Sequence, residues 1–188
     1  MKNILSLVSY KILPADTGGQ RGIAFFNQYL ARVSNLVCVS VKSNDASLAE
    51  QYKMMPILSD SPLRYVNLFY FFKIRKIIQE ENIEWLILEH PYYGWLAWLL
   101  KRFTNVKLAI HTHNIEHERF RSVGKNWWKL LRIYEKWTFE IADRIFCISE
   151  EDRQFMIDQM KVNAAKCILV PYGIKPEHAP ENKKEVKH

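Results

Sequence analysis

Seven short apolar runs recur along the chain, and helical patterns lie between most of them. The runs are rich in Val, Ile and Leu and mostly lack polar alternation, as expected for parallel strands covered on both faces. They are NILSLVSY, NLVCVSV, LRYVNL, EWLILEH, VKLAIHT, RIFCIS and KCILVPYG. After the first run, Ile23, Phe26 and Leu30 fall on one helical face. The pattern predicts an α/β fold with a Rossmann-like, doubly wound and mainly parallel sheet of about six to seven strands.

The end of the chain has a different pattern. Residues 175–188 follow Pro171-Tyr172-Gly173 and contain two prolines, clustered charges and no apolar periodicity. Such a segment is typical of a linker or tail. We therefore expect one domain over residues 1–174 and a linker over residues 175–188.

Composition and charge narrow the class of protein. The chain has 188 residues, 48% of them hydrophobic, so it can bury a core and is not a disordered polymer. Its three cysteines are too far apart for a disulfide framework, which favours a cytosolic protein. The start lacks a signal-peptide cleavage pattern, and YYGWLAWLL is too short to span a bilayer. The net charge of +7 indicates an acidic partner: a membrane surface, a nucleic acid or a phosphorylated ligand.

A glycine pair stands between the first apolar run and the first helical pattern. Gly18 and Gly19 let backbone N–H groups approach a ligand, and a helix N-terminus favours negative charge, so a phosphate fits here. The spacing matches neither GxGxxG nor a Walker loop, which disfavours a dinucleotide site and a P-loop ATPase. A plain strand-to-helix turn remains an equally good interpretation.

The fifth apolar run ends in the most polar cluster of the chain, AIHTHNIEHERF. His111 and His113 are expected on the same side of an extended strand end. A metal-dependent hydrolase using the HTHNIEH cluster is one interpretation, although the spacing is not HExxH. A histidine that hydrogen-bonds a sugar or phosphate oxygen is the favoured one. An exposed turn position is a better account of His117, and of His178 and His188 in the tail, than of His111.

The fourth run ends in EHPYYG, where Glu89 and His90 are candidates for an acid/base pair. Pro91 and the two tyrosines equally describe a simple strand exit, and we favour that interpretation.

A basic stripe is predicted on the helix that begins near Asn126. Its residues are spaced by four, three and four, with three tryptophans nearby, and they are Lys125, Lys129, Arg132 and Lys136. A basic, Trp-bearing amphipathic helix is typical of a protein that rests on an anionic membrane. A solvated helix face opposite a Trp-rich core is the alternative.

Taken in order, several of these segments resemble the N-terminal domain of a family 4 glycosyltransferase with the GT-B fold. The segments are ADTGGQRGIAFF, EHPYYG, IHTHNIEHERF, YEKWTFEIADRIFCISEEDR and VPYGI, and the similarity reaches about Ile174. In that family two Rossmann-like domains face each other across a cleft. The resemblance implies that the N-terminal domain mainly holds the acceptor and the C-terminal domain mainly holds a nucleotide sugar.

The resemblance also implies roles for single residues. Gly18 and Gly19 would lie in the loop that approaches the donor diphosphate. His111 would be the catalytic strand-end histidine that contacts the transferred sugar. Ser149 would cap a helix. Three more residues would line the acceptor side: Arg21, Thr112 and His113.

One family hallmark, a Glu-(seven residues)-Glu pair of the C-terminal domain, has no convincing counterpart. The pairs Glu81/Glu89 and Glu177/Glu185 have that spacing but not the required context, so we interpret them as chance matches. The linker would lead to a donor-binding domain outside this chain.

The resemblance therefore implies half of a retaining, hexosyltransferase-like enzyme of cell-surface polysaccharide biosynthesis. It would move a sugar from a nucleotide-diphosphate sugar to a glycan or lipid-linked acceptor, without a metal or other cofactor. We expect the 188 residues alone to be inactive, and the protein to be cytoplasmic and peripheral on the inner face of the membrane. A nucleic-acid partner is not expected. A non-catalytic membrane-docking domain remains the alternative from the binding class.

Overall fold

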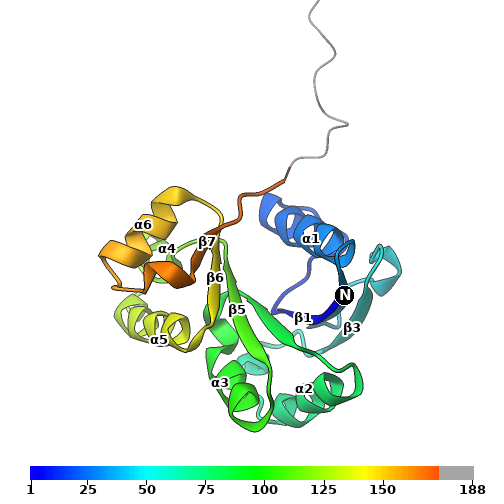
Figure 1. Ribbon diagram of the computed structural model, residues 1–188. Helices are drawn as coiled ribbons and strands as arrows, with labels where there is room; N and C mark the ends of the chain where they lie inside the picture. The colour runs from blue at the N-terminus through cyan, green and yellow to red at the C-terminus, as the bar shows by residue number, and fades with distance from the viewer. Residues whose placement is uncertain (174–188) are drawn as a thin grey trace, which may run out of the picture.

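The computed structural model describes residues 1–173, and seven parallel strands form one sheet within them (Figure 1). The strands lie in the order β3-β2-β1-β4-β5-β6-β7. Their bounds are β1 (Lys2–Val8), β2 (Ser34–Val41), β3 (Lys53–Leu58), β4 (Trp85–Glu89), β5 (Lys107–Thr112), β6 (Arg144–Cys147) and β7 (Cys167–Leu169). Because all strands run the same way, their carboxyl ends gather at one edge of the sheet. The predicted Rossmann-like fold is confirmed.

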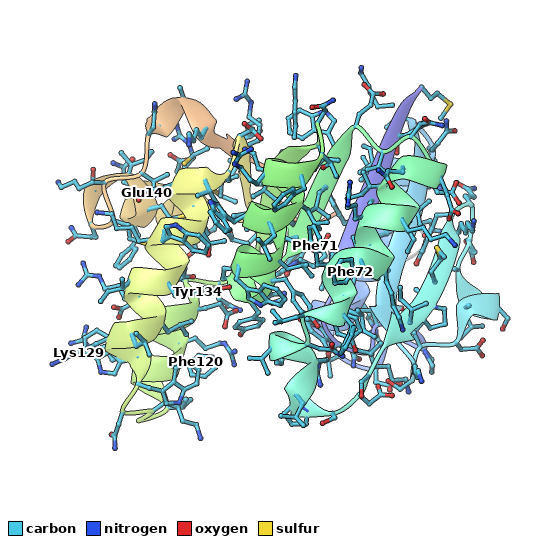
Figure 2. All side chains as sticks on the ribbon, turned by 90° about the horizontal axis from the view of Figure 1, so that it is seen from below. Phe71, Phe72, Phe120, Lys129, Tyr134 and Glu140 are labelled. Atoms are coloured by element: carbon cyan, nitrogen blue, oxygen red, sulfur yellow. The ribbon has the colours of Figure 1, made fainter. Side chains whose placement is uncertain are left out.

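Helices cover both faces of the sheet. Their bounds are α1 (Gly18–Ala31), α2 (Phe69–Glu80), α3 (Gly94–Phe103), α4 (Glu116–Ser122), α5 (Trp128–Ile141) and α6 (Glu150–Asp158). The chain moves outward along the sheet from β1 to β3 and then in the opposite direction from β4 to β7. Right-handed crossovers therefore place α1 on one face and α2, α3 and α5 on the other (Figure 1). Figure 2 shows α2, α3 and α5 side by side on the second face.

The third strand differs from the sequence prediction. LRYVNL is not a strand: it contains the 3₁₀ helix η2 (Pro62–Val66), where the side chain of Ser61 accepts the N–H of Leu63. The strand is instead Lys53–Leu58, which contains Pro56. A proline removes a ladder hydrogen bond, but β3 is an edge strand that pairs only with β2, so its unpaired side tolerates this loss.

Two local features fix the starts of helices that follow strands at the carboxyl edge. Gly94 begins α3, and a Cβ at this position would lie 2.2 Å from Oγ1 of Thr138, so only glycine lets α3 pack this closely on α5. The side chain of Ser149 accepts the N–H of Asp152 at the start of α6. This N-cap confirms the structural role that was predicted for Ser149.

Candidate active site

Two neighbouring strands bring a carboxylate and two histidines together at the carboxyl edge. Glu89 ends β4 and lies opposite His111 of β5 in the sheet register. Oε2 of Glu89 is 2.9 Å from Nδ1 of His111 and 2.8 Å from Nε2 of His113. All three side chains are buried. The two-residue spacing of an extended strand end places both rings on one side, as predicted.

The charge of this cluster is set by competing effects. Burial alone would raise the pKa of Glu89, but the electrostatic attraction and the N–H groups of the His111 and His113 rings outweigh this effect and lower the pKa to about 2. Burial lowers the pKa of His113. The hydroxyl of Tyr172 lies 2.6 Å from Nδ1 of His113. We assign His113 as neutral, donating Nε2–H to Glu89 and accepting the hydroxyl proton of Tyr172.

His111 keeps one nitrogen free for a ligand. Its Nδ1–H donates to Glu89, so Nε2 is left as an acceptor. That buried atom has no hydrogen-bond partner within residues 1–173. The ring of Phe26 packs 4.2 Å from the imidazole, centroid to centroid. His111 also lines a pocket of about 350 Å³ between α1 and residues 170–173. A hydroxyl group entering this pocket could donate to Nε2.

The segment after β7 closes one side of this pocket. Tyr172 packs so tightly on Gly22 of α1 that a Cβ there would lie 2.4 Å from a carbon of the tyrosine ring. A glycine at position 22 is therefore required for Tyr172 to reach His113. Sequence reasoning assigned Tyr172 no role, because its contact with His113 joins positions far apart in the chain.

The glycine pair opens α1 at the same edge. Thr17 caps the helix in a capping box with Gln20, and a Cβ at Gly18 would meet no atom within 4 Å. The backbone here is open to a ligand, and phosphate binding by Gly18 and Gly19 stays a prediction. Arg21 is exposed, and its Nε lies 3.5 Å from the carbonyl of Ala15, at the weak limit of a hydrogen bond.

The hydroxyl of Thr112 has a hydrogen-bond partner within the sheet. It is buried, and its hydroxyl donates to the carbonyl of Phe146 on β6 at 3.1 Å. This bond accounts for Thr112 without a ligand, so its acceptor-binding role, like that of Arg21, stays a prediction.

The interpretation of EHPYYG as a simple strand exit is wrong for Glu89. This residue is the centre of the cluster, and its partners are His111 and His113 rather than its sequence neighbour. The ring of His90 makes no hydrogen bond with the carboxylate of Glu89; its Nε2 lies 3.7 Å from Oε1 of Glu116. A carboxylate that ends a buried parallel strand was the signal available in the sequence.

His90 itself has an unusual backbone. Its φ of 85° and ψ of 154° fall in a region that is populated almost only by glycine. The ring stacks on His113, with 4.6 Å between centroids. Strained residues cluster at functional sites, which supports the assignment of this edge as the site.

His117 is not an exposed turn residue. It is fully buried, and its Nδ1 lies 2.6 Å from Oε2 of Glu135 on α5. The same carboxylate accepts the backbone N–H groups of Glu116 and His117. Ile115 has no side-chain acceptor for these groups, so Glu135 serves as the missing cap of α4. His178 and His188 lie outside the described residues.

These positions bear on the metal hypothesis. Among the described residues, Glu89, His111 and His113 form a group whose ligand atoms lie within 4.8 Å of one another. His117 is not part of it because it is held by Glu135. The expected ligand set of three histidines from HTHNIEH is therefore not assembled.

Two of the four side chains in the predicted basic stripe have polar partners within residues 1–173. Arg132 donates to the carbonyl of Gln159, and Lys136 lies 3.9 Å from Glu140. Lys125 precedes α5, and Lys129 lies on the side of α5 that faces away from α3 (Figure 2). Exposed apolar side chains of the same region accompany them: Trp127, Leu130 and Ile133. No helix within residues 1–173 is long and apolar enough to cross a membrane.

A parallel sheet of this order, with a polar cluster at its carboxyl edge, defines a Rossmann-like domain, a class of fold whose ligands bind beyond the strand ends. The chain belongs to Glycosyltransferase Family 4, whose family model matches residues 17–178. It is 26% identical over 129 residues to the O-antigen biosynthesis glycosyltransferase WbnH of Escherichia coli. That match covers 66% of this chain and 36% of WbnH, so the chain spans about a third of this relative.

Solved glycosyltransferase structures share the fold. The sucrose-phosphate synthase of Thermosynechococcus elongatus superposes with a TM-score of 0.67 at 16% identity, over 92% of this chain and 49% of the synthase. Anabaena HepE, solved in complex with UDP-glucose, gives a TM-score of 0.66 at 14% identity, over 93% of this chain and 44% of HepE. The chain thus has the fold of the N-terminal half of a GT-B enzyme.

Proposed function

We propose that this chain is the acceptor-binding domain of a retaining glycosyltransferase that moves a sugar from a nucleotide-diphosphate sugar to a glycan or lipid-linked acceptor. Family membership gives the reaction class. The observation that supports the role of the site is the free Nε2 of His111, a buried acceptor on the wall of a ligand-sized pocket. The complex of HepE with UDP-glucose supports a nucleotide sugar as donor, and WbnH supports a role in cell-surface polysaccharide biosynthesis.

The chemistry follows from what each group can do. Glu89 fixes the ring and tautomer of His111, so that Nε2 accepts a hydroxyl of the transferred sugar near the reacting carbon. The N-terminus of α1 at Gly18 and Gly19 carries a positive partial charge that would stabilise the leaving diphosphate. The remaining cations would come from a donor-binding half, so the proposed reaction uses no metal or other cofactor.

The place of action is also part of the proposal. Lys125 and Lys129, beside exposed Trp127 and Leu130, would hold the domain on the anionic inner face of the membrane, in the cytoplasm. A lipid-linked acceptor would be met at that surface, and nucleic acid is not a partner.

The first experiment tests the inactivity of the chain alone. The 188 residues are incubated with radiolabelled UDP-glucose and oligosaccharide acceptors, and no labelled product is expected. Transfer above the protein-free background would overturn this part of the proposal.

The second experiment tests the acceptor role. The ring resonances of His111 and His113 are followed by NMR during titration with oligosaccharides and, separately, with UDP-glucose. We expect oligosaccharides to shift both resonances, and His111→Ala to abolish the shift of His113. Lys107→Ala, at the opposite edge of the sheet, is the control and should leave the shifts intact. Unchanged resonances in the unsubstituted chain would contradict the acceptor role.

A further inference from the structure

A second polar pocket lies beside the histidine cluster and is not used by it. We call this the tyrosine pocket, and it has a volume of about 360 Å³. It is lined by Tyr10, Tyr65, His90, Tyr92, Asn114, Glu116 and Arg119. His90 lies between this pocket and the histidine cluster. Its ring stacks on Tyr92, which lines the pocket, and on His113, which belongs to the cluster.

The carboxylate of Glu116 is only half satisfied in this pocket. Its Oε2 accepts hydrogen bonds from Tyr92 at 2.5 Å and from Arg119 at 2.7 and 3.0 Å. Its Oε1 is buried and has no hydrogen-bond partner within residues 1–173, and the same holds for Nδ1 of His90. Glu116 as a residue is only 1% exposed. Leaving a buried carboxylate oxygen without a hydrogen bond is unfavourable. Nε2 of His90 lies 3.7 Å from this oxygen, too far for a hydrogen bond, so a hydroxyl group of a ligand could supply the missing donor.

The remaining lining indicates the chemistry of that ligand. Tyrosine rings offer flat apolar faces, while the Glu116 oxygen accepts and Arg119 donates hydrogen bonds. A sugar ring matches this set, because it has C–H faces and several hydroxyl groups around its edge. The pocket volume falls within the range of small-molecule sites.

An apolar groove lies next to the tyrosine pocket. We call it the aromatic groove: its volume is about 630 Å³, and it is lined by Tyr65, Tyr92, Phe120, Trp127, Leu130, Leu131 and Tyr134. Tyr65 and Tyr92 line both cavities, so the groove and the pocket share a wall. Figure 2 shows Tyr134 of α5 on the side that faces α3, and Lys129 of the same helix on the other side.

We propose that the two cavities together bind one amphiphile, with a glycosyl head in the tyrosine pocket and a long apolar tail in the aromatic groove. This proposal rests on the proposed function and specifies the acceptor as a lipid-linked sugar. Tyr65 and Tyr92 line both cavities, so the head and the tail of one molecule would lie against the same two side chains. An apolar tail is also the occupant that matches the surroundings, because the groove residues Trp127 and Leu130 are 49% and 68% exposed.

The path of the ligand also fits the reaction. A head held by Glu116 lies next to His90, whose ring stacks on His113 at the histidine cluster. A hydroxyl of the head could then point toward the pocket of His111, while the tail extends away from the reacting atoms. Glu116 and Arg119 act here as acceptor-binding residues, not as catalytic ones.

Binding of defined amphiphiles tests this inference without any transferase activity. Monomeric decyl maltoside is titrated into the chain by calorimetry, below its micelle concentration, against maltose and decylphosphocholine. Decyl maltoside has the same head group as maltose and the same alkyl chain length as decylphosphocholine. We expect decyl maltoside to bind at least about tenfold more tightly than either, a difference of about 1.4 kcal/mol.

Matched variants assign the two halves of the site. Leu130→Asp should reduce decyl maltoside binding to the level of maltose, whereas Ile133→Asp should not. Ile133 is a suitable control because it is 69% exposed on the same helix, against 68% for Leu130, and does not line the groove. Glu116→Gln should remove the preference for the maltosyl head over phosphocholine. The melting temperature of each variant confirms folding.

Two results would overturn the amphiphile proposal. Equal binding of decyl maltoside and decylphosphocholine would mean non-specific detergent adsorption, and equal effects of Leu130→Asp and Ile133→Asp would mean that the groove is not the tail site. Either result leaves the acceptor role intact if oligosaccharides still shift the resonance of His111. Loss of that shift would instead contradict the proposed function.

Discussion

The carboxylate of Glu89 lies 2.9 Å from Nδ1 of His111 on the neighbouring strand, and the two side chains are no more than 1% exposed. Neither group could be buried alone without a large desolvation penalty. Their pairing keeps a charged carboxylate in the interior of the sheet edge and leaves Nε2 of the imidazole for a ligand.

Removing the charge of Glu89 should destabilise the fold. We expect Glu89→Gln to lower the free energy of unfolding by about 3 kcal/mol, because a neutral amide accepts weaker hydrogen bonds from the two imidazoles and adds a buried NH₂ group that needs an acceptor. Urea unfolding followed by circular dichroism measures this. Glu84→Gln is the matched control, because Glu84 pairs with Lys2 at the surface, and its unfolding midpoint should stay unchanged. Equal effects of the two variants would contradict the role of Glu89.

The stability of the domain should fall in two acidic steps. Burial, followed by the charge of His113, lowers the pKa of His90 from 6.5 to about 4. The unfolded state therefore binds more protons than the folded state between these values, and stability decreases as the pH falls through this window. The lowered pKa of Glu89 adds a second loss, which begins below its ordinary value and is complete near pH 2.

Unfolding free energies measured from pH 8 to pH 3 test whether stability is lost first in the His90 range and then in the Glu89 range. His90→Gly should reduce the slope between pH 6.5 and pH 4, since glycine tolerates the backbone at this position and does not titrate. The part of the slope that comes from His113 should persist. An unchanged slope in His90→Gly would contradict the burial of a neutral His90.

A side chain at Gly22 should release Tyr172 from His113. In Gly22→Ala the new methyl group would overlap the tyrosine ring, and the ring must move because it is the more mobile partner. We expect the NMR resonance of His113 to shift, with a loss of about 1 kcal/mol for the lost hydrogen bond. Gly19→Ala is the control, because the space around it is open. Retention of the His113 resonance in Gly22→Ala would show that Tyr172 does not hold this ring.

The basic and apolar surface at the start of α5 should give charge-dependent membrane binding. Co-sedimentation with vesicles that contain phosphatidylglycerol should exceed that with neutral vesicles, and the difference should shrink in high salt. Lys129→Glu should weaken binding to the anionic vesicles. Lys107→Glu, at the amino end of β5, changes the net charge equally and should not. Equal binding to both vesicle types would count against an electrostatic role.

Metal content separates the transferase proposal from the hydrolase alternative. The glycosyltransferase proposal expects no stoichiometric zinc or manganese in protein purified without chelator, because Nδ1–H of His111 and Nε2–H of His113 already donate to Glu89. Elemental analysis of the purified chain measures this. Bound metal that is lost in His111→Ala would favour a metal-dependent hydrolase.

Much of the fold could be predicted from the sequence because it depends on local patterns. Unbroken apolar runs indicated buried parallel strands, and helical periodicity between them indicated crossovers. The exception, β3, contains Pro56, and only its edge position in the sheet explains why a strand forms there. The motif order of the chain also indicated the family, because motif order is a property of the sequence alone.

The composition of the site depended on contacts that no local pattern encodes. The sequence placed His111 and His113 on one side of a strand end, since that follows from the two-residue period of an extended chain. It did not place Glu89 between them, nor His117 on Glu135, because these partners lie on other elements whose register and packing bring them together. The sequence thus determined which residues end the strands, whereas the tertiary structure decided which polar groups meet, because burial makes each of them depend on a partner from another element.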